Sequence, residues 1–94
     1  MNIWEKEAAQ DLCRAIMSLK DEKECMDFLE DICTIKEIMD MSQRLSVAMK
    51  LQKGLSYNEI SKLTGASTAT ISRVGKCYEY GCGSYKRIIE RLEK

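Results

Sequence analysis

Apolar residues recur at the spacing of an α-helix along the whole chain, and this pattern constrains the fold more than any other feature. Near the start, for example, Trp4, Ala8, Leu12, Ile16 and Leu19 follow one another at intervals of three or four residues. Such intervals place side chains on one face of a helix, whereas a half-buried strand alternates apolar and polar residues. The 94-residue chain also contains no proline that would interrupt a helix. We therefore predict an all-α fold of about six helices.

Capping residues and glycines predict the ends of the first three helices. The first helix is expected over residues 3–20. Asp21, followed three residues later by Glu24, resembles a capping box, so a second helix should begin near residue 22. Ser42 is a candidate cap for a third helix over residues 43–53, and Gly54 suits its C-terminal end.

The predicted second helix has an unusually broad apolar face that continues to residue 39. Its apolar positions are Cys25, Phe28, Leu29, Ile32, Ile35 and Met39, widened by Met26, Cys33 and Ile38. One antiparallel neighbour cannot cover a face of this breadth. The pattern indicates burial against several helices, some of them from a second chain.

Residues 55–78 have the pattern of a helix-turn-helix. Ser56 with Glu59 forms a second capping box, and Gly65 suits a tight turn that needs a positive φ. Ser61 and Ala66 are small where the two helices must approach, and Ser67 or Thr68 can cap the second helix, which should end near residue 78. The expected apolar wedge between the helices consists of Ile60, Leu63, Ile71 and Val74.

Short polar or methyl-bearing side chains begin the second helix of this pattern, and they suit close approach to the major groove of DNA. The candidate DNA-binding residues on this helix are Ser67, Thr68, Ala69, Thr70, Ser72, Arg73 and Lys76. The first helix adds Tyr57, Asn58 and Lys62, which could hold flanking phosphates together with Arg73 and Lys76. The alternative is a helical hairpin with a purely structural role that does not bind DNA, in which the serines and threonines only cap helices.

The net charge of zero hides a split between the two halves of the chain. Residues 1–41 carry 11 acidic and 5 basic residues, whereas residues 42–94 carry 4 acidic and 10 basic residues. A basic half of this kind is typical of a chain that binds a polyanion through that half. Two ordinary solvated surfaces would give the same numbers of charged residues. The split agrees with a DNA-binding helix-turn-helix at residues 55–78, which is called the reading head below.

From about Thr34 to the end, the chain resembles the Trp repressor superfamily, and as a whole it resembles the branch of small TrpR-related proteins called YerC/YecD. The resemblance lies in Gly65-Ala66, in the run 69–73 (Ala-Thr-Ile-Ser-Arg) and in the helix from Arg44 to Gly54. It implies a single domain over residues 1–94 that forms an intertwined homodimer. Residues 1–53 would be the dimerisation core, residues 55–78 the helix-turn-helix and residues 84–94 a C-terminal helix. It also implies a transcription regulator, expected to be a repressor, that binds paired half-sites.

The type member of that family binds tryptophan between two arginines, which suggests an amino-acid effector here. Arg73 matches one of those arginines, while the other falls at Gln43, next to Arg44. Cys77 stands where the family has a hydroxyl near the ligand amine. The candidate effector residues are therefore Arg44, Arg73 and Cys77, and Arg73 has phosphate contact as an alternative role.

Other classes of function find little support in the sequence. There is no histidine, and the five cysteines form no CxxC pair, so neither a zinc site nor a hydrolytic triad is expected. No cofactor is expected, and we predict that the protein is not an enzyme. No apolar run is long enough for a membrane span, and the N-terminus lacks a signal-peptide pattern, so a cytoplasmic protein is expected. One alternative to a DNA-binding regulator is a protein-interaction module with a vestigial reading head. A thiol-based enzyme or sensor using Cys77 and Cys82 is the other.

Overall fold

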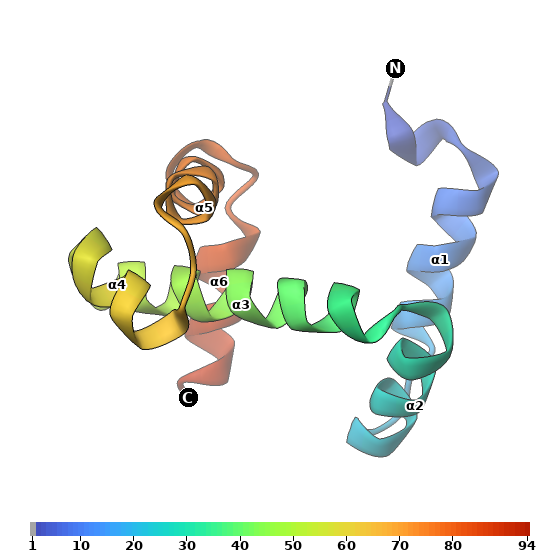
Figure 1. The fold of residues 1–94 in the computed structure, drawn as a ribbon. Coiled ribbons are helices and arrows are strands. Elements are labelled where there is room, and N and C mark those ends of the chain that lie inside the picture. The colour runs from blue at the N-terminus through green and yellow to red at the C-terminus, as the bar shows by residue number, and fades with distance from the viewer. Residues whose placement is uncertain (1) are drawn as a thin grey trace. The chain divides into compact units, whose positions relative to one another are not determined.

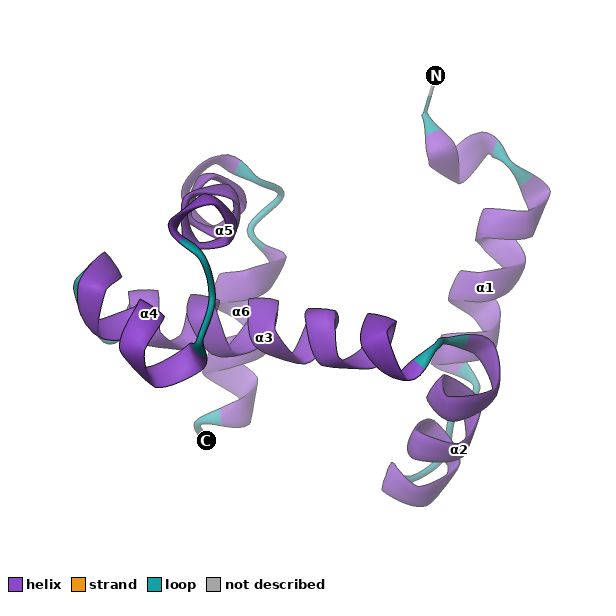
Figure 2. Ribbon diagram, in the orientation of Figure 1, coloured by secondary structure: helices purple, strands orange, loops and turns teal. Residues whose placement is uncertain are grey.

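The computed structural model describes residues 2–94, and within that range its elements are helices joined by loops, with no strand (Figures 1 and 2). A 3-10 helix, η1 (Ile3–Glu5), precedes six α-helices. These are α1 (Glu7–Met17), α2 (Glu22–Ile32), α3 (Ile35–Gln52), α4 (Tyr57–Thr64), α5 (Thr68–Tyr80) and α6 (Ser84–Leu92). The prediction of an all-α fold with about six helices is confirmed.

The chain divides into two compact units, the first ending at Ile38 and the second spanning Met39–Lys94. No described residue of the first unit is buried, although its helices are amphipathic. Its exposed large apolar side chains are Ile3, Trp4, Leu12, Ile16, Met17, Met26, Ile32 and Ile35. The first unit therefore has an apolar surface that its own residues do not cover.

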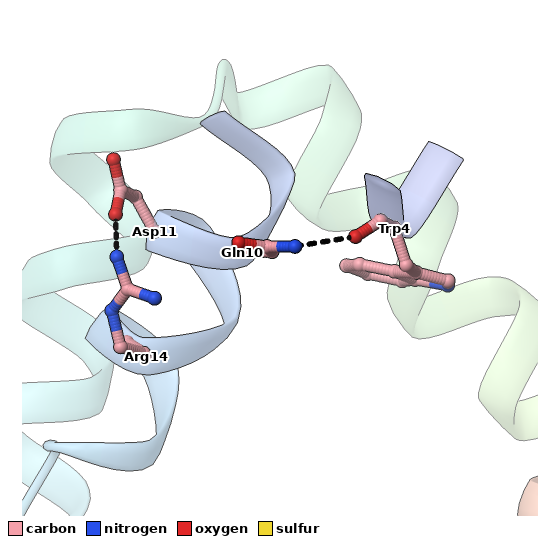
Figure 3. A network of polar contacts seen from close by, with 4 residues as sticks. All are labelled: Trp4, Gln10, Asp11 and Arg14. Carbon is pink, nitrogen blue, oxygen red and sulfur yellow. Dashed lines mark hydrogen bonds and ion pairs between the residues drawn. The ribbon is translucent and has the colours of Figure 1, made fainter. Parts of the chain in front are cut away.

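The single helix predicted over residues 3–20 is wrong, because extended backbone at Lys6 separates η1 from α1. Asn2 Oδ1 caps η1 by accepting from the Trp4 N–H at 3.0 Å, and Gln10 Nε2 then donates to the Trp4 carbonyl at 2.9 Å (Figure 3). Arg14 pairs with Asp11 on the exposed side of α1. Local polar contacts thus fold the N-terminal residues back onto the start of α1.

The boundary between α2 and α3 also differs from the prediction. Asp21 caps α2 as expected, since its Oδ1 accepts from the Glu24 N–H at 2.8 Å. The second half of the expected capping box differs, because Glu24 Oε1 accepts from the Lys20 N–H at 3.3 Å. However, α2 ends at Ile32 instead of continuing to Met39, and Ser42 lies inside α3 instead of before it. A capping box at Thr34 and Glu37 explains both errors: Thr34 Oγ1 accepts from the Glu37 N–H at 3.1 Å, and Glu37 Oε1 accepts from the Thr34 N–H at 2.8 Å.

Replacing Thr34 with alanine is expected to destabilise the protein by about 1 kcal/mol, because the first turn of α3 loses a side-chain acceptor for its backbone N–H groups. Thr34→Ser is the matched control, since it retains the hydroxyl and should stay near wild-type stability. Urea unfolding followed by far-ultraviolet circular dichroism measures both. Equal stability of the alanine and serine variants would contradict the role of this capping box.

The core of the second unit joins α3, α4, α5 and α6, which gather around the C-terminal part of α3 in Figure 1. Its buried residues are Val47, Ala48, Ile60, Ala66, Ile71, Val74 and Ile89. Three of the four residues predicted for the wedge between α4 and α5 are among them. Leu63 is not, because it lies about 60° around α4 from Ile60 and is 65% exposed, lining a cavity of about 410 Å³ beside α3.

Candidate nucleic-acid interface

The first helix of the predicted helix-turn-helix, α4, begins and ends as its sequence requires. Ser56 Oγ accepts from the Glu59 N–H at 3.2 Å, and Glu59 Oε1 accepts from the Ser56 N–H at 3.2 Å. Gly65 ends the helix with φ +73°, and its N–H donates to the Ser61 carbonyl. The capping box and the left-handed glycine predicted from the sequence are both confirmed.

Side-chain hydrogen bonds close the turn between α4 and α5. Ser61 Oγ donates to the Ala66 carbonyl at 2.9 Å, and the Ala66 N–H donates to Thr64 Oγ1 at 3.1 Å. Gln43 of α3 adds a contact that the sequence analysis missed, since its Nε2 donates to the Thr64 carbonyl at 3.2 Å. These bonds satisfy backbone groups at the end of α4 and hold the turn against α3.

Replacing Gly65 with alanine is expected to cost about 1–2 kcal/mol, because a residue with a Cβ is strained at positive φ. The cost is conformational only, since an added Cβ would meet no atom within 4 Å. Gly65→Asn is the control, because asparagine tolerates this conformation and should recover much of the loss. Chemical denaturation of both variants tests the expectation, and an alanine variant as stable as wild type would contradict it.

The start of α5 presents small side chains and free backbone donors. Ser67 Oγ accepts from the Thr70 N–H at 3.2 Å and lies 3.1 Å from Thr70 Oγ1, to which it donates. Thr68 and Ala69 are exposed, and the first turn of α5 contains no acidic residue. A helix N-terminus of this kind favours negative charge such as phosphate, because its N–H groups and its dipole point toward the ligand.

The remaining predicted DNA-binding residues lie on the same two helices, so the fold brings the whole predicted set into one helix-turn-helix. Those that are exposed are Tyr57, Asn58, Lys62, Arg73 and Lys76, while Ser72 and Thr70 are partly buried. No acidic partner pairs with the three basic side chains among the ion pairs of residues 2–94. Their charges are available for an anionic ligand.

The predicted effector residues Arg44, Arg73 and Cys77 all lie exposed in the second unit. Arg44 lies exposed on α3 and its Nε donates to the Asp40 carbonyl at 3.4 Å, while Arg73 and Cys77 lie exposed one turn apart on α5. None of the three lines the cavity beside α3 and α4, nor a second cavity of about 250 Å³ between α3 and α6.

Cys82 lies in the connection between α5 and α6, where its Sγ is 3.0 Å from Ser84 Oγ. Hydrogen bonding from Ser84 lowers the pKa of the Cys82 thiol, with a smaller contribution from the nearby charge of Arg87. All five cysteines are free thiols. The contacts with Ser84 therefore favour deprotonation of Cys82 relative to a free cysteine.

An all-helical chain with two short helices joined at a left-handed glycine, the second beginning with small exposed residues, defines a helix-turn-helix protein. The chain belongs to the Trp repressor family: residues 7–93 match the family described as Trp repressor protein. This is a regulatory DNA-binding family rather than an enzyme family. The resemblance drawn from the sequence is confirmed.

Individual relatives agree with this assignment. The uncharacterized protein YerC from Bacillus subtilis is 48% identical over 83 residues, covering 88% of this chain and 80% of that protein. A solved TrpR-like protein from Eubacterium eligens has 50% identity and a TM-score of 0.90, covering 94% of this chain and 91% of its own. A candidate Trp repressor from Staphylococcus aureus has 42% identity and a TM-score of 0.89, covering 99% of this chain and 95% of its own.

Within residues 2–94, none of the helices combines the length and apolar character that a membrane crossing requires.

Proposed function

We propose that this protein is a sequence-specific transcriptional repressor that binds double-stranded DNA as a homodimer, with α4 and α5 as its reading head. One observation carries the proposal: α5 begins with exposed small residues at an acid-free N-terminus, held by a capped α4 and a hydrogen-bonded turn. Membership of the Trp repressor family supports the same function.

The reading head would place the first turn of α5 in the major groove. Thr68 and Ala69 could then approach base edges, while Lys62, Arg73 and Lys76 would neutralise phosphates on either side. Five or six phosphate contacts per half-site would lower log K by about 0.9 for each contact per log unit of salt. The proposed repressor should therefore bind DNA with a steep dependence on salt.

The uncovered apolar surface of the first unit supports a homodimer. Leu12 and Ile16 lie one turn apart on α1, and both are more than two-fifths exposed. A second copy of the chain offers the same surface in return, as two-fold symmetry requires. Residues 1–53 would form this dimerisation core, and the two reading heads would bind half-sites about 34 Å apart, one turn of DNA.

Selection of bound fragments from a pool of random DNA duplexes tests the proposal most directly. Recovery of a palindrome whose half-sites are about one helical turn apart is the expected result, since it reports base recognition and dimer symmetry together. No enrichment, combined with no salt-dependent retention on DNA, would overturn the proposal and favour a protein-interaction module instead.

An amino-acid effector is a separate prediction with its own test. Titration calorimetry with L-tryptophan measures binding directly and does not depend on DNA. The absence of a binding heat at L-tryptophan concentrations up to millimolar would rule out tryptophan as the effector.

A further inference from the structure

We propose that Tyr57 is a positioning residue that sets the angle between α4 and α5, with its hydroxyl seated in a notch that Gly75 leaves open on α5. This inference rests on the proposed function and names one residue through which the reading helix is held. The sequence alone predicts that Tyr57 holds a flanking phosphate, and it indicates no role for Gly75.

Gly75 has no conformational reason to be glycine. It is the eighth residue of α5, it is buried, and the positive-φ glycines of residues 2–94 are Gly54, Gly65 and Gly83 instead. Glycine weakens a helix interior relative to alanine, so its place in the middle of α5 needs another explanation. A close approach by a neighbouring group is the usual one.

The neighbouring group is the Tyr57 hydroxyl. A Cβ added at Gly75 would lie 2.9 Å from Tyr57 Oη, closer than real Cβ atoms come to another heavy atom. The same Cβ would lie 3.9 Å from Tyr57 Cζ and 4.0 Å from Leu51 Cδ1, which are ordinary contacts. The hydroxyl oxygen alone therefore occupies the space that a side chain at position 75 would need.

This contact lies far from the turn of the helix-turn-helix, so it can fix the angle between α4 and α5. Tyr57 is the first residue of α4, about 12 Å along that helix from the turn at Gly65. The hydrogen bond from Ser61 to Ala66 fixes the two helices at the turn itself. A second contact far from the turn then determines how widely they open, and hence where α5 presents its first turn to DNA.

Three variants test the proposal through their coupling: Gly75→Ala, Tyr57→Phe and the two combined. Gly75→Ala should weaken binding to the selected palindrome by about tenfold, because the added Cβ displaces the Tyr57 hydroxyl from the notch and removes this contact between α4 and α5. Tyr57→Phe empties the notch and should cost about threefold. The double variant should be no weaker than Tyr57→Phe alone, since the ring without its oxygen tolerates the Cβ. Tyr80→Phe is the control expected to bind like wild type, because it removes the hydroxyl of an 87% exposed residue at the end of α5.

The opposite pattern would overturn the proposal. If the Tyr57 hydroxyl holds a phosphate, the two losses should multiply to about thirtyfold in the double variant, because independent sites are additive in free energy. Binding to a random duplex of equal length serves as a second measurement. The positioning role predicts that Gly75→Ala weakens this non-specific binding less than binding to the palindrome, since non-specific binding depends on charge.

Crystal structures of the same variants without DNA separate this inference from the proposed function. Gly75→Ala should change the angle between α4 and α5, and the double variant should restore it. An unchanged angle in Gly75→Ala, with Tyr57 simply swung outward, would refute the positioning role even if the protein binds DNA. A changed and restored angle would support it even if selection recovers no palindrome.

Discussion

Replacing Thr68 and Thr70 together with glutamate is expected to abolish specific DNA binding, lowering affinity for a selected palindrome by at least about a hundredfold. Two carboxylates at the start of α5 would oppose the phosphates and the electronegative edges of the bases in the groove. A mismatched contact in such a site costs about 1–3 kcal/mol, and the double change affects both half-sites. Electrophoretic mobility shift or fluorescence anisotropy measures the loss.

Lys20→Glu is the matched control for this double variant. It changes the net charge by the same two units, but it lies in the first unit on an exposed residue outside the reading head. We expect it to weaken binding only slightly, through long-range charge, and less so at higher salt. Unchanged affinity of the glutamate double variant would count heavily against α5 as the reading helix.

Replacing Ile16 with aspartate is expected to dissociate the proposed homodimer. Burying an aliphatic side chain contributes about 1.5–3 kcal/mol, and two-fold symmetry applies the loss twice, so about 3–6 kcal/mol of association energy should disappear. The dimer dissociation constant should rise by about two to four orders of magnitude. Sedimentation or light scattering would report the change in mass, and DNA binding should fall with it because a single head reads one half-site.

The control for this second prediction is again Lys20→Glu, which adds an acidic side chain close to α1 without removing an apolar one. It should remain dimeric at the same protein concentration. A dimeric Ile16→Asp variant, or a monomeric wild type, would show that the exposed apolar face of α1 serves some other purpose.

The second unit could be predicted closely from sequence because its boundaries are set by local chemistry. The Ser56–Glu59 capping box, the left-handed Gly65 and the Ser67 cap act over three or four residues, and each was found where expected. The Thr34–Glu37 box has the same signal, but the apolar stripe continues through it to Met39, and the stripe alone predicts one uninterrupted helix. That pair of residues by itself predicts the start of α3 correctly.

Contacts between helices could not be predicted in the same way. Leu63 matches the apolar spacing of α4, yet tertiary packing leaves it exposed beside a cavity. The bond from Gln43 to Thr64 joins residues 21 positions apart. Gly75 was visible as a glycine inside a helical run, but only the position of Tyr57 explains it.

The absence of any buried residue among residues 2–38 has a consequence for how much active protein a cell contains. If that segment becomes buried only when two chains associate, the concentration of active dimer rises with the square of the chain concentration while most chains are still monomers. At low abundance, halving synthesis would then reduce the functional pool about fourfold, whereas at high abundance the response becomes proportional. The same surface that mediates pairing would make the regulator sensitive to its own gene dosage.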